Sequence, residues 1–187
     1  MENIAVLFSG NGTNLEYILN NMHNRYVNVV LALTNNPNAN GIKFAKEHNI
    51  PLEIIDSKKF SSREDFDKEV VDAIKKSNAK LTVLAGFMRI LTPIFTSQIK
   101  AINLHPSLLP KHKGLNAIKR SYEDSSNIGG VSVHYVTSEL DSGEIIVQKS
   151  IKKDNLSYQE YYNKIKIIEK EALKEAILKH FKILYKQ

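Results

Sequence analysis

Three polar side chains of different chemistry fall within and after one proline-flanked segment. Asn103 and His105 lie in Asn-Leu-His-Pro-Ser-Leu-Leu-Pro, and Asp141 follows in Glu-Leu-Asp-Ser-Gly. An amide can donate a hydrogen bond to a developing oxyanion, and an imidazole can exchange a proton near neutral pH. A carboxylate can hold that imidazole in one tautomer and raise its pKa. Together they predict a site for attack on a carbonyl group, although each residue alone is more typical of a surface loop.

Alternating strand and helix patterns position these residues. Short apolar runs are each followed by a segment with helical spacing, which is typical of β-α-β units in a parallel sheet. Ser61-Ser-Arg-Glu64 has the spacing of a capping box that opens one of the helices. The predicted strands are residues 4–8, 27–34, 51–56, 81–86 and 101–104, and the predicted helices are 15–22, 42–49, 61–74 and 93–99.

The pattern changes near residue 130. Residues 130–136 alternate between apolar and polar, and residues 144–148 follow a turn, which predicts an antiparallel hairpin. A helix from about residue 157 to residue 181 ends the pattern, with an apolar stripe at Tyr161, Ile165, Ile168, Ala172 and Leu173. We expect an α/β fold: a single doubly wound, mostly parallel sheet with helices on both faces and an antiparallel addition near the C-terminus. No linker interrupts residues 1–187, so we predict one domain.

Composition limits the chemistry. Of the 187 residues, 42% are apolar and 25% are charged, as in ordinary globular proteins. The lack of cysteine excludes disulfides, thiolate catalysis and sulfur-ligated zinc. No histidines or acids have metal-ligand spacing on one face, so no metal is predicted. The N-terminal segment has the pattern of neither a signal peptide nor a membrane span, and we expect a cytoplasmic protein without a membrane partner.

A net charge of +6 and a pI near 9.3 raise the question of a polyanionic partner. From Lys152 onward there are nine lysines against five acids. These lysines alternate with acids and apolar residues, as on the solvated face of a helix, and no nucleic-acid motif is present. We therefore expect no nucleic-acid partner, while a small anionic substrate would benefit from the positive field. The oligomeric state does not follow from the sequence.

Ser9-Gly-Asn-Gly-Thr-Asn14 lies between the first strand and the first helix, where open α/β sheets bind ligands. Its glycines allow close approach of the backbone, and a helix N-terminus offers free N–H groups to a phosphate. The segment lacks the third glycine of a dinucleotide fingerprint and the Gly-Lys of a P-loop. A phosphate cradle and a plain glycine turn both remain open at this point.

Arginine is rare in this lysine-rich chain, and two arginines have informative positions. Arg89 follows a buried strand at the edge of the sheet where ligands bind, which favours a role in gripping a carboxylate. Arg63 begins a helix, so a binding role and a plain surface charge are equally consistent with its position. His134 lies in the alternating segment and is interpreted as a packed or supporting residue. The remaining histidines are interpreted as surface residues: His23, His48, His112 and His180.

Four motifs, in order and in register over nearly the full length, resemble the phosphoribosylglycinamide formyltransferase family of folate-dependent enzymes. They are Ser9-Gly-Asn-Gly-Thr-Asn-Leu15, Ala85-Gly-Phe-Met-Arg-Ile-Leu-Thr-Pro93, Ile102-Asn-Leu-His-Pro-Ser-Leu-Leu-Pro110 and Gly130-Val-Ser-Val-His-Tyr-Val-Thr-Ser-Glu-Leu-Asp-Ser-Gly143. The resemblance implies formyl transfer from 10-formyltetrahydrofolate to the amine of 5-phosphoribosylglycinamide in purine biosynthesis. It implies small-molecule substrates and no metal.

The resemblance also implies roles for individual residues. Asn103, His105 and Asp141 correspond to the catalytic set, and Asn103 and Asp141 also to the folate site. Residues that correspond to the substrate-binding set, at the phosphate and the ribose, are Gly12, Thr13, Asn14 and Glu169. Residues that correspond to the folate wall, the partners of its glutamate tail and the loop over its pteridine are Arg63, Met88, Arg89, Ile90, Leu91, Thr137 and Leu140.

The sequence departs from the family in two places. Asn116 and Ile118 stand where the family often has histidines, and the residues around Glu169 differ from the usual pattern. Both departures concern substrate contacts rather than the reaction. We expect direct attack by the amine, with Asn103 and protonated His105 stabilising the oxyanion and Asp141 raising the pKa of the imidazole above about 6.5.

Other functions use a similar trio. A formyltetrahydrofolate hydrolase would use water in place of the amine, and such enzymes carry an extra N-terminal domain. Methionyl-tRNA formyltransferase needs a second, C-terminal domain for which 187 residues leave no room. A nucleotide-binding module with a decayed site is the alternative from a different class, and the intact trio argues against it.

Overall fold

The computed structural model describes residues 1–184, and the chain divides into two compact units, Met1–Ile102 and Asn103–Gln187. The elements of the first unit are β1 (Glu2–Phe8), α1 (Thr13–Asn21), β2 (Val27–Thr34), α2 (Ile42–Glu47), β3 (Leu52–Ile54), a 3-10 helix η1 (Ser57–Lys59), α3 (Arg63–Lys76), β4 (Leu81–Leu84) and α4 (Pro93–Thr96). Strand β5 (Ala101–His105) begins in the first unit and ends in the second. The second unit continues with α5 (Ala117–Glu123), β6 (Ile128–Tyr135), β7 (Ile145–Lys152) and α6 (Tyr158–His180).

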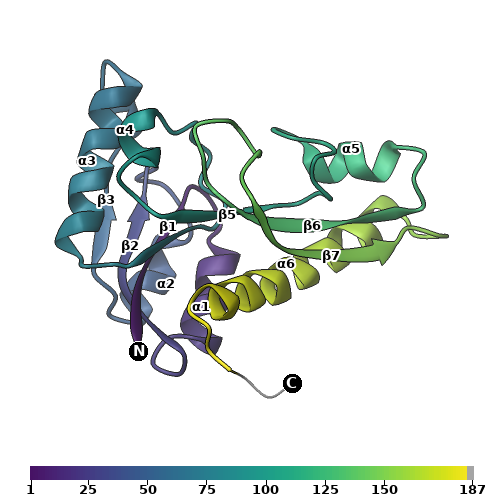
Figure 1. Ribbon diagram of the computed structural model, residues 1–187, viewed down its shortest axis with the longest axis horizontal. Coiled ribbons are helices and arrows are strands. Elements are labelled where there is room, and N and C mark those ends of the chain that lie inside the picture. Colours follow the sequence, from purple (N-terminus) through teal and green to yellow (C-terminus); the bar gives the residue numbers. More distant parts are fainter. Residues whose placement is uncertain (185–187) are drawn as a thin grey trace. The chain divides into compact units, whose positions relative to one another are not determined.

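The first unit is built on parallel strands. Strand β1 pairs with β2 on one side and β4 on the other, and β2 pairs with β3 (Figure 1). All residues of β1 from Ile4 to Phe8 are fully buried, because a central parallel strand is covered on both faces. Side chains from α1 and α3 add to this core, among them Leu15, Ile18, Phe66, Val70 and Ile74.

The second unit packs a long helix on an antiparallel hairpin. Strands β6 and β7 pair antiparallel, and α6 runs alongside them (Figure 1). The contact is close at Gly129, where an added Cβ would lie 2.0 Å from the hydroxyl of Tyr161. Tyr161 is fully buried, and its hydroxyl shares a hydrogen bond of 2.9 Å with Ser121 in α5. A glycine in β6 therefore makes room for the ring that joins α6 to α5.

The fold class is the one expected from the sequence. The seven strands lie in the order β3-β2-β1-β4-β5-β6-β7, mostly parallel, with the antiparallel addition at the C-terminal end and helices around the sheet. Several helices and strands begin or end at other residues than the sequence pattern predicts. Strand β4 ends at Leu84, two residues early, whereas β7 runs on to Lys152. Helix α5 was not predicted.

The predicted capping box at Ser61 is wrong by one residue. Ser62 is the N-cap of α3, and its Oγ accepts a hydrogen bond of 3.0 Å from the backbone N–H of Asp65. The extended backbone of Ser62 (φ −131°, ψ 157°) is the conformation that lets a side chain reach back to the first turn. Because Ser61 and Ser62 are adjacent, either serine could be the N-cap residue by sequence pattern alone.

Helix α6 carries one charged residue inside its apolar stripe. Glu169 is 2% exposed, while the predicted stripe residue Ile168 is only partly buried. Lys186, one of the lysines counted in the basic C-terminal segment, lies outside the described residues. Within residues 1–184, no helix combines the length and the apolar character needed to cross a membrane.

Candidate active site

Strand β5 brings Asn103 and His105 to the same side of the chain. Residues two apart in a strand point in the same direction, and Leu104 between them points the other way. His105 is 6% exposed, and Asn103 is partly buried. The chain leaves the strand through Pro106, and the following loop is held by Ser132 of β6, whose Oγ accepts from the N–H of Leu109 at 3.0 Å. The loop after β5 is therefore fixed to the hairpin.

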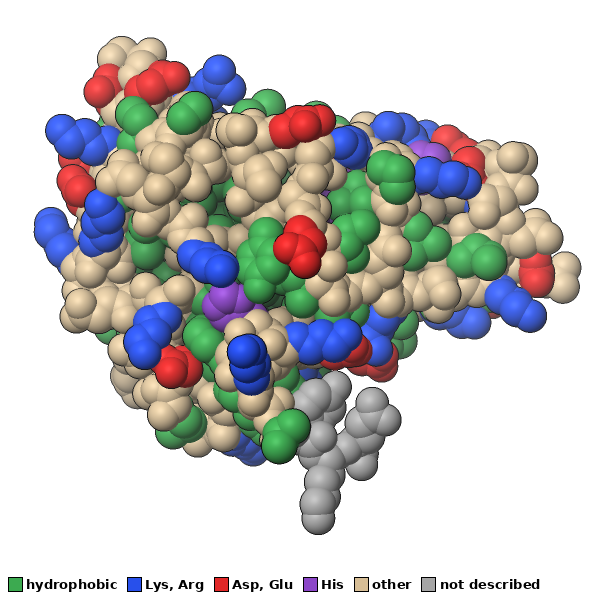
Figure 2. All heavy atoms as spheres, in the orientation of Figure 1, with side chains coloured by type: hydrophobic (Ala, Val, Ile, Leu, Met, Phe, Trp, Pro, Cys, Tyr) green, Lys and Arg blue, Asp and Glu red, His purple; other side chains and the backbone are tan. Residues whose placement is uncertain are grey.

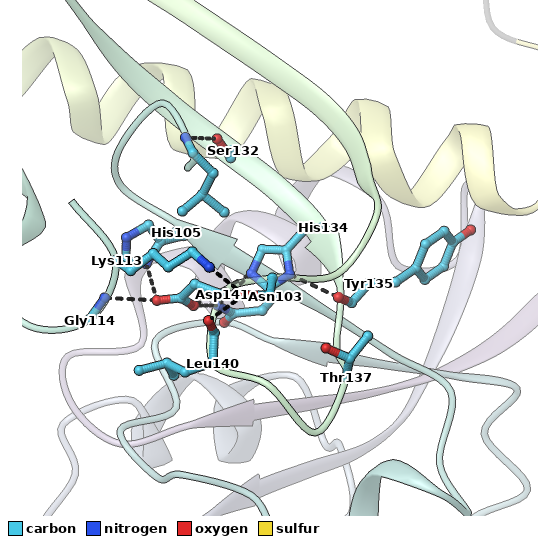
Figure 3. Close-up of polar contacts among 12 residues, drawn as sticks. Asn103, His105, Lys113, Gly114, Ser132, His134, Tyr135, Thr137, Leu140 and Asp141 are labelled. Atoms are coloured by element: carbon cyan, nitrogen blue, oxygen red, sulfur yellow. Dashed lines mark hydrogen bonds and ion pairs between the residues drawn. The ribbon is translucent and has the colours of Figure 1, made fainter. Parts of the chain in front are cut away.

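Asp141 lies in the turn between β6 and β7 and connects the other members of the site (Figure 3). Its Oδ2 accepts a hydrogen bond of 2.8 Å from the N–H of Gly114 and lies 3.4 Å from Nδ1 of His105. Its Oδ1 lies 3.4 Å from Nδ2 of Asn103. Asp141 has a φ of 49° and is 7% exposed. The three residues predicted from the sequence therefore come together around one buried carboxylate.

His134 orients the amide of Asn103. Its Nδ1 lies 2.8 Å from the carbonyl oxygen of Tyr135, so Nδ1 carries the hydrogen, and Nε2 is left to accept. Nε2 lies 3.2 Å from Nδ2 of Asn103 and 3.6 Å from Oδ1 of Asp141. His134 is 2% exposed, which confirms the interpretation as a packed, supporting residue.

The two ring nitrogens of His105 have different partners. Nε2 lies 2.9 Å from the backbone carbonyl oxygen of His112, and a carbonyl only accepts, so Nε2 carries a hydrogen. Nδ1 faces Asp141. Burial lowers the pKa of His105 below 6.5, and the hydrogen bond to His112 and the charge of Asp141 offset only part of that effect. The expected upward influence of Asp141 is present, but the expectation of a raised pKa was wrong because burial dominates.

Asp141 remains ionised despite its burial. Burial alone would raise its pKa, but the contact with His134, the N–H of Gly114 and the charge of His105 together lower the pKa below 3.8. A fixed negative charge therefore faces Nδ1 of His105 throughout the neutral range. This arrangement favours the imidazolium once Nδ1 has taken a proton.

The glycine loop of the first unit forms the start of α1. Gly12 is the N-cap with a φ of 69°, and a Cβ there would lie 2.5 Å from the Cα of Gly41. Thr13 is exposed and begins the helix, and Asn14 is 8% exposed. The loop is held by a hydrogen bond of 3.0 Å from the N–H of Gly41 to the carbonyl of Gly10. Only glycine fits at residue 12, because an added Cβ would meet the backbone of Gly41 and the φ is positive.

The loop after β4 exposes apolar side chains and one arginine. Met88 is 69% exposed and Ile90 is 58% exposed, whereas Leu91 is partly buried. The guanidinium carbon of Arg89 lies 5.2 Å from the ring centroid of Phe66, a cation–π contact. Exposed large apolar residues next to a ring-stacked arginine are suited to a flat ligand with a carboxylate.

Helix α3 fixes both ends of that loop. Phe66 stacks on Phe87 with ring centroids 6.4 Å apart, and the buried carboxylate of Asp67 accepts a hydrogen bond of 2.6 Å from the N–H of Thr92. Arg63, at the start of the same helix, is exposed. Asp67 was not found from the sequence, since an acid in an amphipathic helix gives no sign of a buried partner.

The other candidate binding residues lie in the second unit. Leu140 is 50% exposed, and the hydroxyl of Thr137 donates to the carbonyl of Glu139 at 3.2 Å in the turn that ends at Asp141. Glu169 is paired with Lys166, whose Nζ lies 2.9 and 3.1 Å from its two carboxylate oxygens. A buried carboxylate with a half-exposed lysine is a suitable acceptor for hydroxyl groups.

The sequence pattern predicts a plain surface role for His112, and this prediction is wrong. Its carbonyl contacts His105, and its ring lies 2.8 Å from Asp124. Among residues 1–184, no cluster of three or more histidines and acids has the geometry to hold a metal ion.

An α/β sheet that brings an amide and an imidazole of β5 together with an ionised carboxylate from the β6–β7 turn is typical of an enzyme of the acyl-transfer type. The sequence matches the formyl transferase family over residues 2–177, and the chain belongs to this family. It is 40% identical over 155 residues to phosphoribosylglycinamide formyltransferase of Haemophilus influenzae, covering 81% of this chain and 73% of that protein.

Two further relatives bear on the same question. The crystal structure of phosphoribosylglycinamide formyltransferase from Campylobacter jejuni superposes with a TM-score of 0.95 at 51% identity, covering 96% of this chain and 97% of the other. The trifunctional purine biosynthetic protein adenosine-3 of Gallus gallus is 40% identical over 152 residues, which are 79% of this chain but only 15% of that protein. The likeness to the trifunctional protein concerns that part alone.

Proposed function

We propose that this chain transfers a formyl group from 10-formyltetrahydrofolate to the amine of 5-phosphoribosylglycinamide, a step of purine biosynthesis. The observation that carries the proposal is the convergence of Asn103, His105 and Asp141 in a chain of the formyl transferase family. The names of its relatives support the choice of donor and acceptor.

The reaction needs no covalent intermediate with the protein. The substrate amine attacks the formyl carbon and forms a tetrahedral intermediate with a negative oxygen. The amine loses a proton, the bond from the formyl carbon to the folate nitrogen breaks, and that nitrogen takes up a proton. The products are the formylated amide and tetrahydrofolate, so atoms and charge balance. The absence of cysteine agrees with direct attack.

His105 and Asp141 provide for the proton. With the hydrogen fixed on Nε2, the lone pair of the neutral imidazole is on Nδ1, beside the carboxylate of Asp141. Nδ1 can accept the proton of the attacking amine, and the resulting imidazolium is stabilised by the adjacent charge. The same Nδ1–H can then stabilise the oxyanion or protonate the leaving nitrogen, directly or through water.

Asn103 contributes the second donor. One N–H of its amide is directed to Nε2 of His134, and the other makes a long contact of 3.4 Å with Asp141. The long contact is the one that can be exchanged for a substrate oxygen. An amide donor held in this way costs little reorganisation when the oxyanion forms.

The remaining candidate residues divide between the two substrates. We assign Gly12, Thr13 and Asn14 to the phosphate of the acceptor, because a helix N-terminus preceded by glycines suits an anion. We assign Glu169 to the ribose hydroxyls. We assign the folate to three groups of residues: the loop after β4, the start of α3 and the turn before Asp141. Their members are Met88, Arg89, Ile90 and Leu91 in the loop, Arg63 in the helix, and Thr137 and Leu140 in the turn.

We further propose that residues 1–187 act as one formyltransferase domain, in the cytoplasm, without a nucleic-acid or membrane partner. The family match across both compact units supports a single domain. Several lysines of the C-terminal segment are paired with acids, such as Lys166 with Glu169 at 2.9 Å and Lys179 with Glu175 at 2.8 Å. On the face in Figure 2, basic and acidic side chains are interspersed rather than gathered in one basic patch.

The test is an assay of folate product with the purified protein. Product should appear only when 5-phosphoribosylglycinamide is present, and Asn103→Ala or His105→Ala should lower kcat by roughly a hundredfold or more, the usual effect of removing an oxyanion donor. Release of tetrahydrofolate without the amine would identify a hydrolase instead. Near-normal kcat in both variants would refute the assigned roles.

Glu169→Gln separates binding from chemistry. Loss of a charged acceptor should raise KM for the ribonucleotide by about tenfold, the value of one hydrogen bond to a charged group, with kcat nearly unchanged. Lys174→Gln, a charge change on the same helix, is the control. A change in KM for the folate alone would contradict the assignment of Glu169 to the ribose.

A further inference from the structure

Three ionisable side chains form a connected group behind the carbonyl that His105 contacts. Nε2 of His112 lies 2.8 Å from Oδ2 of Asp124, and Oδ1 of Asp124 lies 2.7 Å from Nζ of Lys153. His112 belongs to the loop after β5, Asp124 is the C-cap of α5, and Lys153 follows β7. The group joins three separate parts of the second unit.

Lys153 holds the end of α5 in place. Its side chain is 8% exposed, and its ammonium donates to the carbonyl oxygens of Ser121, Tyr122 and Asp124 at 2.6, 3.3 and 3.1 Å. The last carbonyls of a helix have no intrahelical donors, and a cation placed there satisfies them. Lys153 therefore fixes both the helix end and the carboxylate of Asp124.

Asp124 is a permanent anion in this position. The hydrogen bond from Lys153 lowers its pKa most, burial opposes this, and the contacts with His112 and the N–H of Ser126 lower it further, so the pKa lies far below 3.8. A carboxylate that is ionised at neutral pH accepts hydrogen bonds only. Nε2 of His112 must therefore donate, which fixes the orientation of that ring.

The ring and the carbonyl of His112 belong to one residue in an uncommon backbone conformation. His112 has a φ of 58°, in the left-handed region. Its ring reaches Asp124, while its carbonyl oxygen accepts from Nε2 of His105 at 2.9 Å. A ring anchored at Asp124 therefore restrains the backbone of the same residue, including the carbonyl that faces His105.

We propose that His112, anchored by Asp124 and Lys153, is a positioning residue that fixes the tautomer and direction of the catalytic imidazole. This inference rests on the proposed function, in which His105 exchanges a proton at Nδ1. The carbonyl of His112 keeps the hydrogen of the neutral ring on Nε2. Without that acceptor, the carboxylate of Asp141 would attract the hydrogen to Nδ1, and the lone pair would point away from the substrates.

Other charged groups around His105 do not replace this contact. Asp141 faces Nδ1, Nε2 of His134 contacts the amide of Asn103, and Arg120 acts on the ring through its charge, so none of the three accepts from Nε2 of His105. The tautomer of His105 in the neutral state is therefore the direct reporter of the contact with His112. It can be read without any substrate.

The first experiment is a set of variants of the full chain. His112→Asn tolerates the left-handed backbone but is too short to reach Asp124, whereas His112→Gln restores a donor of suitable length. Asp124→Asn keeps the shape of the group and removes its charge. His48→Asn is the control, because His48 also makes hydrogen bonds, to Phe44 and Asn20, in the other unit.

The kinetic result should separate positioning from folding. We expect His112→Asn to lower kcat by roughly ten- to a hundredfold, the cost of a small misplacement of a catalytic group, with both KM values unchanged within about twofold. In the native protein the hydrogen bond to His112 raises the pKa of His105. Its loss should lower that pKa, so the limb of the pH profile that reports His105 should move to lower pH. His112→Gln should recover most of kcat, and His48→Asn should match the wild type.

The second experiment reads the tautomer by nitrogen NMR of histidine-labelled protein at about pH 8, above the usual pKa of histidine. The resonance of His105, assigned by its loss in His105→Asn, should change from the Nε2–H to the Nδ1–H form in His112→Asn and in Asp124→Asn. Variants that melt like the wild type and keep both kcat and the Nε2–H form would overturn the proposal. If the wild type transferred no formyl group, the proposed function would fail while the tautomer result would still stand or fall by itself.

Discussion

The imidazole of His105 lies between two acceptors, an uncharged backbone carbonyl and an ionised carboxylate. The carbonyl of His112 faces Nε2, and the carboxylate of Asp141 faces Nδ1. Because burial lowers the pKa of the ring, the neutral form is favoured in the free protein, and Nδ1 is ready to accept a proton. A base that becomes an acid in the next step needs both properties.

Asp141→Asn tests the charge beside that nitrogen. We expect kcat to fall by about a hundredfold, within the range for general acid–base catalysis, because the imidazolium loses its counter-charge. The pH limb of His105 should move to lower pH, since Asp141 raises the pKa of the ring. Steady-state kinetics between about pH 5 and 9 would measure both effects across the usual histidine range.

A matched control is Glu123→Gln, which removes an exposed acid from the same unit. Its kcat and pH profile should equal those of the wild type. An unchanged pH limb in Asp141→Asn would mean that the carboxylate positions the ring without affecting its charge.

At this scale the sequence predicts the reacting residues but not their supports. Asn103, His105 and Asp141 are conspicuous because their side-chain types match one reaction. His112 acts on His105 through a backbone carbonyl, and every residue has one, so residue type gives no signal. Gly114 contributes through its own backbone N–H, which donates to Asp141, and Asp67 through its contact with the distant backbone N–H of Thr92, so residue type gives little signal at these positions as well.

Helix α1 depends on a glycine that no other residue can replace. Gly12→Ala would place a methyl group 2.5 Å from the Cα of Gly41 and require a φ of 69°. We expect a loss of unfolding free energy of about 2 kcal/mol or more, from steric overlap and backbone strain together. Urea unfolding of the variant and the wild type would measure it.

Gly10→Ala is the control within the same loop. Its added Cβ would meet nothing within 4 Å, and its backbone is not left-handed. Its midpoint of unfolding should stay close to that of the wild type. Equal losses in the two variants would show that the loop tolerates no side chain for a reason other than the approach of Gly41.

Helix α3 offers a comparison of two adjacent serines. Ser62→Ala should lower the free energy of unfolding by about 1 kcal/mol, because the N–H of Asp65 loses its acceptor at the helix start. Ser61→Ala should have almost no effect. Thermal or urea unfolding of both variants would decide between the observed register and the one in which Ser61 is the cap.

The limits of sequence patterns are clearest at α5 and β7. Helix α5 buries only Ala117, Ile118 and Ser121, too few for a periodic apolar stripe. Strand β7 continues to Lys152 because β6 pairs with it along that length, although residues 149–152 are only partly buried or exposed and include two lysines. Both elements are determined by their neighbours, whereas β1 and β2 are evident from their own apolar runs.

The stability of the whole molecule should fall in acid in two stages. His105 and Asp141 both have pKa values below their usual ones, so the unfolded chain binds more protons than the folded chain at a given pH. Stability from His105 is present above about pH 6.5 and that from Asp141 above about pH 3.9, and each is lost as the pH falls towards the lower folded value. Burial lowers the pKa of His23 as well, which adds to the first stage.

The measurement is the urea midpoint at several values between about pH 8 and pH 5, the range in which histidines take up protons. The midpoint of the wild type should decrease over this range, and that of His105→Asn should decrease less. Parallel curves would show that protonation of His105 does not oppose folding.

The backbone of Asp141 restricts which sequences can occupy this position in related chains. With a φ of 49°, the position suits aspartate, asparagine or glycine and disfavours branched or longer side chains, glutamate included. If a homologue lost its activity through a substitution at this position, asparagine and glycine are the replacements that would best preserve the fold. Homologues with asparagine or glycine at this position are thus expected to fold normally but to have lost most of their catalytic activity.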